Sequence, residues 1–301
     1  MRNGAMAVVG AAVLWGTAGT AGLLTSADPI SVAAARLVIG GVALAVVARA
    51  GLRRAVSPGL VLAALAVAAY QLCFFAAVSR TGVAIGTVVA IGSGPVFTGL
   101  LSWVLHGKAP TRRWAGATAA AIAGCAALIV GAGPAEGDAR AAGGEVALGV
   151  GLALLGGLLY AFYAVTAARH IEAGQSSNAV MGVLFGGAAV AMVPVLLWTG
   201  PGWLAEPTSL LAALYLGLGT TALAYFLYGR GLRSTPVATA ATLALAEPAV
   251  AALLGLVVLH ETLTPLSVGG LLLLGASLVA VAVPERKQPL AEAGVGGGRP
   301  R

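Results

Sequence analysis

Residues 235–259 read TPVATAATLALAEPAVAALLGLVVL, an apolar stretch with one charged side chain, Glu247, directly before Pro248. The hydrocarbon core of a bilayer is about 30 Å thick, and about 20 apolar residues in a helix cross it. The stretch therefore predicts a membrane-spanning helix that carries a carboxyl group near its middle.

The rest of the chain has the same character. Of its 301 residues, 59% are hydrophobic and 9% are charged, whereas charged residues make up about 25% of a typical soluble domain. The mean hydropathy is +0.97. A water-soluble fold of this length needs more polar surface, and a disordered chain needs more charge. Both classes are excluded, which leaves a polytopic membrane protein.

Ten apolar runs of spanning length follow one another. They cover residues 4–24, 29–48, 59–79, 82–105, 114–131, 146–168, 178–198, 209–229, 235–259 and 264–284. Eight of them contain no Asp, Glu, Lys or Arg, and the exceptions are Arg36 and Glu247. The sequence therefore predicts an all-α membrane protein with ten transmembrane helices.

The basic residues indicate how the helices are oriented. With the N-terminus inside, all 17 Lys and Arg residues fall on the inner side except Arg36, Arg80 and Arg140. This bias follows the positive-inside rule. We expect a cell inner (cytoplasmic) membrane protein with cytoplasmic N- and C-termini. The net charge of +7 then reflects topology, and no nucleic-acid partner is expected.

The most polar stretch between two runs, 132–144, divides the chain into two sets of five helices, 4–131 and 145–284. A polar tail, 285–301, is expected to be disordered and cytoplasmic. A shift of 153 residues superimposes Phe75 on Tyr228, Arg80 on Arg233, Pro95 on Pro248, Thr111 on Thr264 and Gly116 on Gly269. Because each half has an odd number of helices, the halves enter the membrane in opposite directions. Transporters with such inverted repeats bind substrate near mid-membrane, between the halves.

Several motifs resemble the EamA-type transporters of the drug/metabolite transporter superfamily. They are Trp15-Gly16, Arg36, Ser93-Gly94-Pro95, Ala246-Glu247-Pro248, and His260-Glu261-Thr262-Leu263-Thr264 followed by Gly269 and Gly275. The resemblance covers almost all of 5–284. It implies movement of small metabolites, often amino acids, without ATP. The first half departs from the pattern, because Gly94 replaces the Glu before Pro95 and Lys108 stands where the second half has Glu261. Any carboxylate role at mid-membrane therefore belongs to Glu247.

Glu247 and Arg36 are the charged candidates for function. Desolvation favours a neutral Glu247, which either gains and loses a proton during transport or caps a backbone carbonyl freed by Pro248. Arg36 either extends to the outer interface or pairs with Glu247 or with a substrate carboxylate. The sequence leaves these alternatives open.

Pro95 and Pro248 lie at matching mid-membrane positions. Each is expected to kink its helix and free a carbonyl, that of Ile91 or that of Ala244. Kinked helices at matching places in two halves point to a transport site, although a static packing kink has the same sequence signature.

Aromatic and amide side chains away from the interfaces are the remaining candidates. Core packing explains any one of them, but as a set we expect them to line a cavity for a small amphipathic or zwitterionic solute. The expected substrate cavity comprises Trp15, Arg36, Tyr70, Gln71, Phe75, Ser93, Tyr160, Tyr163, Tyr225 and Tyr228.

The sequence thus predicts a secondary transporter that binds a small-molecule substrate by alternating access, with export the favoured direction and Glu247 the candidate for proton coupling. We expect no catalytic residues, no cofactor and no metal site, because neither a phosphate-binding loop nor metal-ligand spacing is present. The chain is expected to be a monomer or homodimer. The alternatives are a membrane-embedded enzyme acting on lipids, or a lipid, drug or nucleotide-sugar carrier of the same fold.

Overall fold

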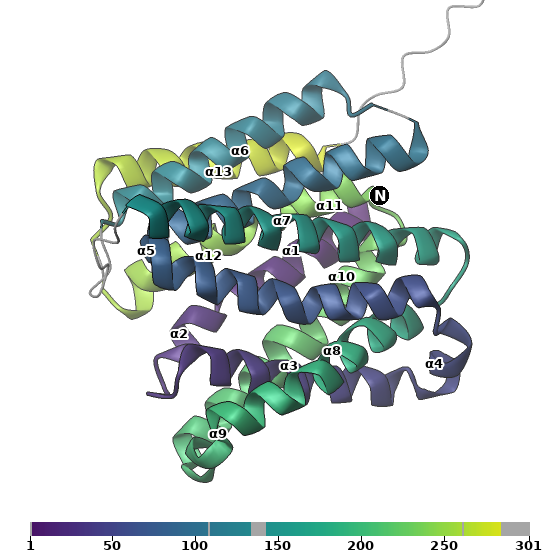
Figure 1. The fold of residues 1–301 in the computed structure, drawn as a ribbon. Helices are drawn as coiled ribbons and strands as arrows, with labels where there is room; N and C mark the ends of the chain where they lie inside the picture. Colours follow the sequence, from purple (N-terminus) through teal and green to yellow (C-terminus); the bar gives the residue numbers. More distant parts are fainter. Residues whose placement is uncertain (1, 108, 134–142, 261, 284–301) are drawn as a thin grey trace, which may run out of the picture.

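The computed structural model describes residues 2–107, 109–133, 143–260 and 262–283, and these ranges are helical without strands (Figure 1). Most of the linker expected at 132–144, and all of the tail expected at 285–301, lie outside the described residues, as do Lys108 and Glu261. The elements are α1 (Arg2–Gly16), α2 (Ala18–Gly22), α3 (Pro29–Val47), α4 (Arg49–Ala55), α5 (Pro58–His106), α6 (Arg112–Gly131), α7 (Gly143–Glu172), α8 (Ser177–Thr199), the 3₁₀ turn η1 (Pro201–Ala205), α9 (Pro207–Leu214), the π-helix η2 (Tyr215–Leu223), α10 (Ala224–Leu232), α11 (Val237–Leu243), α12 (Ala246–Val258) and α13 (Pro265–Ala282).

The described residues contain nine segments that are long and apolar enough to cross a membrane, and one of them accounts for two crossings. That segment, Pro58–Leu105, has 48 residues, so a straight helix would be more than twice as long as a bilayer core is thick. Gly82 interrupts it with φ 80° and ψ 162°, a conformation that glycine adopts without steric penalty.

The chain turns back at Gly82, so that both arms of α5 run along α7 (Figure 1). A Cβ atom built on Gly156 would lie 3.6 Å from the Tyr70 ring. One on the adjacent Gly157 would lie 3.2 Å from Cβ of Ser93. Residues from the two arms thus meet α7 at the same height, and the predicted ten helices are confirmed.

Four of the helices, α3, α5, α6 and α13, begin at side-chain caps. Asp28 accepts hydrogen bonds from the Ile30 and Ser31 amides at 2.9 and 3.2 Å, directly before Pro29. Thr111 and Thr264, which the 153-residue shift superimposes, cap the last helix of each half at 3.2 Å. Such caps satisfy amides that have no partner within the helix. Equivalent threonines therefore start equivalent helices.

Contacts between the two halves pair equivalent helices. The second spans, α3 and α8, pack on each other, and so do the last spans, α6 and α13. The first span of each half packs on the third and fourth spans of the other half, α1 on α10 and α12, and α7 on both arms of α5. Exchanging the halves leaves this set of contacts unchanged, as a two-fold relation between them requires.

Glycines allow these helices to approach closely. A Cβ atom at Gly41 of α3 would collide with the Phe185 carbonyl of α8. One at Gly124 of α6 would lie 2.8 Å from the Gly270 carbonyl of α13, closer than real Cβ atoms approach. In lipid there is no hydrophobic driving force for helix association, so membrane helices depend on close van der Waals packing. Small residues at the contacts make this packing possible.

Three spans are interrupted rather than continuous. The first breaks at Thr17, between α1 and α2, and the eighth contains the nine-residue π-helix η2. The two irregular segments are joined, since the Thr17 and Tyr215 hydroxyl oxygens lie 2.7 Å apart. The ninth span breaks at Ala244 and Leu245, between α11 and α12. Discontinuous helices of this kind mark binding sites in transporters.

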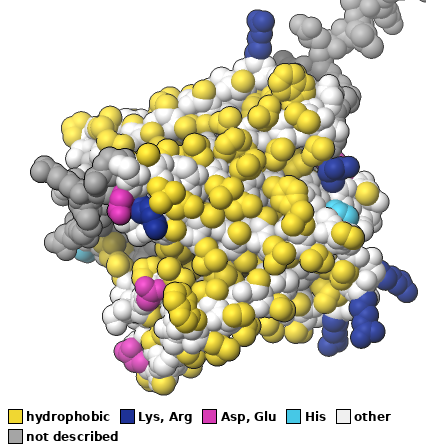
Figure 2. All heavy atoms as spheres, in the orientation of Figure 1, with side chains coloured by type: hydrophobic (Ala, Val, Ile, Leu, Met, Phe, Trp, Pro, Cys, Tyr) yellow, Lys and Arg dark blue, Asp and Glu magenta, His cyan; other side chains and the backbone are white. Residues whose placement is uncertain are grey.

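The outer surface is apolar around its middle, and the charges lie towards its ends. Figure 2 shows a broad band of hydrophobic side chains, with most of the visible Lys and Arg towards the end where the N-terminus lies, and Asp and Glu at the opposite end. Large apolar side chains such as Trp198 and Val190 are exposed, as a lipid-facing surface requires.

Candidate functional site

A cavity of about 80 Å³ lies near the break between α11 and α12, and helices from both halves line it. Its lining residues are Trp15, Arg36, Tyr70, Ala90, Ile91, Gly94, Pro95, Tyr160, Tyr163, Tyr225, Ala241, Ala244, Leu245 and Glu247. We call it the central cavity. It contains one guanidinium and one carboxyl group, and the rest of its lining is aromatic, small or aliphatic.

Arg36 lies against this cavity rather than at the outer interface. When the Gln71 amide is oriented to satisfy both of its atoms, its oxygen accepts hydrogen bonds from Nη2 and Nε of Arg36 at 2.7 and 3.2 Å. Gln71 is only 4% exposed, so burial holds the amide in place. Gln71 thus does not line the cavity itself but positions the guanidinium that does.

Glu247 stands in the first turn of α12, where the positive end of the helix dipole favours a negative charge. It lies close enough to Arg36 for the two charges to interact. Among the described residues, no hydrogen-bond donor contacts the Glu247 carboxyl group. The group therefore faces the cavity without a fixed partner.

The helix break decides one alternative that the sequence left open. The Ala244 carbonyl, which Pro248 deprives of its usual donor, accepts a hydrogen bond from the main-chain amide of Glu247 at 3.0 Å. The Glu247 side chain is therefore not the cap of this carbonyl. Pro95 behaves differently, because α5 keeps helical dihedral angles through it. The matching prolines thus do not produce matching breaks.

Four tyrosines from α7 and α10 form two hydroxyl pairs. Tyr160 and Tyr228 oxygens lie 3.2 Å apart, and Tyr163 and Tyr225 oxygens lie 3.4 Å apart. A hydroxyl that donates to its neighbour can still accept, and one that accepts can still donate. The pairs therefore satisfy the buried hydroxyls and retain hydrogen-bonding capacity.

The Trp15 ring closes the cluster from the other half of the chain. Its centroid lies 5.0 Å from that of Tyr225 and 5.6 Å from that of Tyr228. Its Nε1 is buried and has no hydrogen-bond partner among the described residues. Because buried donors are nearly always paired, an unpaired N–H in the lining of a cavity is available to a ligand.

The structure brings most of the predicted cavity residues together but leaves four outside the lining. Tyr228 is fully buried behind Tyr160 and Trp15. Phe75 packs edge-on against Phe74, with ring centroids 5.4 Å apart. Ser93 donates to the Ala90 carbonyl at 3.2 Å and faces Gly157. Gln71 acts through Arg36, as described above. Pro248 is also buried away from the lining.

The lining also contains small and aliphatic residues that were not predicted as site residues. The spacing behind the two prolines identifies Ile91 and Ala244, since each stands four residues before a proline. Ala90, Gly94, Ala241 and Leu245 carry no chemical signal in the sequence. They contribute backbone and shape, which depend on how the helices pack.

Comparison with known proteins identifies the relatives of this chain. The model of the EamA-like transporter family matches residues 2–130 and 147–283. An uncharacterized transporter of Bacillus subtilis (strain 168), YwfM, is 38% identical over 289 residues, which span 94% of this chain and 95% of that protein. A solved crystal structure with 23% identity has the same fold, with a TM-score of 0.76 over 93% of this chain and 98% of the other.

Proposed function

Because the chain belongs to the EamA-like transporter family, we propose that it is a secondary transporter that exports a small zwitterionic metabolite, of which amino acids are the first candidates. The protein is a multi-pass membrane protein of a transporter family. The substrate class, the direction and the coupling are the proposed part.

The composition of the central cavity carries the proposal. Arg36 supplies donors for a carboxylate, and the unpaired Nε1 of Trp15 supplies another. Glu247, in the same lining, suits an ammonium group. Aromatic faces between them accommodate an apolar or aromatic side chain, and they attract cations as well. A free amino acid presents these three features together.

We propose that the end of the bundle with the N-terminus faces the cytoplasm. The basic residues that set this orientation in the sequence gather at that end (Figure 2). A cysteine at Thr208, which lies in the first turn of the eighth span at the opposite end, is expected to react with an impermeant thiol reagent from outside intact cells. Reaction from the cytoplasmic side alone would reverse the orientation.

Thermal unfolding of the purified protein with each of the twenty amino acids tests the substrate class. A ligand at a hundredfold excess over its Kd stabilises the folded state by about 2.7 kcal/mol. We expect at least one amino acid to raise the Tm, and the matching amine without a carboxylate not to do so. Arg36→Gln should remove the shift, whereas Arg80→Gln, a basic residue outside the cavity, should keep it. The proposal fails if no amino acid stabilises the protein or if the amine does so equally well.

Transport itself is measured by counterflow in proteoliposomes with the stabilising amino acid. We expect exchange of labelled solute without ATP. Binding without exchange would assign the cavity to a receptor-like protein instead of a carrier.

A further inference from the structure

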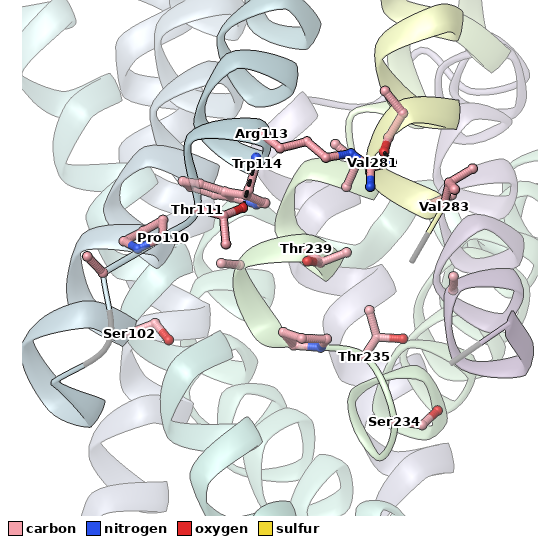
Figure 3. A pocket seen from close by; sticks show the side chains of 17 residues that line it. Ser102, Pro110, Thr111, Arg113, Trp114, Ser234, Thr235, Thr239, Val281 and Val283 are labelled. Atoms are coloured by element: carbon pink, nitrogen blue, oxygen red, sulfur yellow. Dashed lines mark hydrogen bonds between the residues drawn. The ribbon is translucent and has the colours of Figure 1, made fainter. Parts of the chain in front are cut away.

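A second and larger pocket opens at the N-terminal end of the bundle, between α1, α5, α6, α11 and α13 (Figure 3). We call it the end pocket. Its volume is about 330 Å³, which falls in the range of about 300–1,000 Å³ typical of small-molecule sites. The central cavity, at about 80 Å³, falls well below that range. In this structure a metabolite-sized solute therefore has room in the end pocket, and the central cavity has to widen before it can hold one.

The two spaces lie in line, about one helical turn apart. On α5, Pro95 lines the central cavity and Gly99 lines the end pocket. On α11, Ala241 lines the first and Ala238 lines the second. A helical turn rises about 5.4 Å. The end pocket therefore stands directly on the route between the central cavity and the N-terminal face.

A buried hydrogen bond crosses the intervening layer. The Thr118 hydroxyl of α6 and the Thr242 hydroxyl of α11 lie 2.9 Å apart, and both residues are buried. Thr118 lies one helical turn beyond Trp114 on α6, and Thr242 lies one turn beyond Ala238 on α11, so the bond joins the two helices on the inner side of the end pocket. Moving α6 away from α11 would break this hydrogen bond.

The end pocket contains polar groups that the protein leaves unsatisfied. Trp114 Nε1 and Thr235 Oγ1 are buried and have no partner among the described residues, and Thr235 is only 6% exposed. Buried polar atoms are nearly always paired, so two unpaired ones in the lining of one pocket point to a ligand or water that pairs with them.

The charge at the pocket is positive. The Arg113 side chain reaches across the pocket beside the Trp114 ring towards α13 (Figure 3), where Nη2 donates to the Ala280 carbonyl at 2.8 Å. A guanidinium has five N–H donors, and this bond uses one of them. Both residues lie in the first turn of α6, where the positive end of the helix dipole adds to the charge.

We propose that the end pocket is a second binding site, which receives the carboxylate of the transported solute on the cytoplasmic side before the solute reaches the central cavity. The carboxylate would accept hydrogen bonds from Arg113 and Trp114 Nε1. The assignment of the ligand as the transported solute rests on the proposed function, but the preference of the pocket for an anion does not.

The test uses a cysteine at Ala238, in the pocket lining, in a protein whose Cys73 and Cys125 are replaced by alanine. Inside-out vesicles are treated with two thiol reagents of similar size and opposite charge, sulfonatoethyl methanethiosulfonate and trimethylammonioethyl methanethiosulfonate. Each rate is divided by the rate of the same reagent with a small thiol in solution, because the thiolate itself attracts the cationic reagent. After this correction we expect the anionic reagent to react at least about threefold faster, because a nearby guanidinium attracts it.

Arg113→Gln should lower this rate ratio to about one, because it removes the charge that creates the preference. Arg112→Gln removes the same charge from an exposed neighbour that does not line the pocket, and it should keep the preference. Trp114→Phe keeps an aromatic ring, although a smaller one, and removes Nε1–H, so the ratio should fall in part. A corrected ratio of one or less, or a preference that survives Arg113→Gln, would overturn the proposal.

Labelling does not depend on transport, which keeps the two proposals separable. An anion preference without amino-acid binding would support the end pocket and count against the proposed substrate. Amino-acid binding and exchange without the anion preference would support the proposed substrate and count against the end pocket as a second binding site. A cysteine at Ala238 that reacts with neither reagent would show that the pocket is closed to the cytoplasm, which also overturns the assignment.

Discussion

Arg36 and Gln71 form a buried pair in which the guanidinium donates to the amide oxygen at 2.7 and 3.2 Å. The pair joins α3 to the first arm of α5 beside the central cavity. An arginine in a membrane span has a high free-energy cost unless its hydrogen-bond donors have partners. Gln71 satisfies two of them and leaves the others facing the cavity.

Gln71→Leu is expected to weaken substrate binding by about tenfold or more, because a hydrogen bond to a charged group contributes about 1.5–3 kcal/mol. The measurement is the KM for exchange in proteoliposomes. Phe75 lies one turn away on α5, packs on Phe74 and does not line the central cavity, so the KM of Phe75→Leu should stay near the wild-type value. A KM unchanged by Gln71→Leu would show that Arg36 does not need this partner.

Glu247→Gln is expected to abolish the response of transport to a pH gradient while exchange at equal pH on both sides persists. The substitution keeps the shape of the side chain and removes its ability to exchange a proton. Flux is measured in vesicles with an imposed gradient and again after an ionophore collapses it. A wild-type flux that is indifferent to the gradient, or a variant that still responds, would remove Glu247 from proton coupling.

The two tyrosine hydroxyl pairs should differ in what they do. Tyr228→Phe removes a hydroxyl that is buried outside the lining, so we expect a loss of stability of about 0.5–1.5 kcal/mol with little change in KM. Tyr225→Phe removes one from the cavity lining and should change KM. A double-mutant cycle of Tyr160→Phe and Tyr228→Phe measures the pair directly, because the second substitution should cost little once the first is made. Additive losses would mean that the 3.2 Å contact stabilises nothing.

Gly41→Ala is expected to destabilise the protein by about 1–3 kcal/mol, because the added methyl group would collide with the Phe185 carbonyl and force α3 away from α8. Gly116→Ala on α6 is the matched control, since its Cβ would meet nothing within 4 Å. That substitution should be neutral or stabilising, because alanine favours helix more than glycine does. The Tm in detergent distinguishes the two variants. Equal Tm values would show that α3 and α8 can move apart without loss of stability.

Some features of the site follow from residues that the sequence alone identifies. Glu247 and Arg36 stand out because charges inside apolar runs are rare, and both line the central cavity. Pro248 marks the break of the ninth span, because a proline leaves the carbonyl four residues earlier without its donor. Pro95 leaves a carbonyl without its donor in the same way, but α5 does not break there. A proline therefore shows where a helix can break, and the packing around it determines whether it does.

Other features have no local signal. The π-helix of the eighth span and the break at Thr17 contain ordinary apolar sequence, and the contact between Tyr215 and Thr17 that joins them links residues 198 positions apart. Phe75 and Tyr70 both belong to the first arm of α5, yet Tyr70 lines the cavity and Phe75 does not. The side of α5 that faces the cavity is set by the contact with α7, which lies far along the chain.

The amino-acid sequence by itself determined the class of the protein and its ten crossings, and its charge bias predicts the orientation. A crossing depends on the summed hydrophobicity of about 20 consecutive residues and on nothing outside them. The tertiary structure decided which side chains meet at the central cavity, that Gln71 and not Glu247 is bonded to Arg36, and where the helices are interrupted. Lipid and protein interior are equally apolar, so a membrane helix shows little contrast between its lipid-facing and buried sides. The neighbouring helices therefore decide which side faces inward.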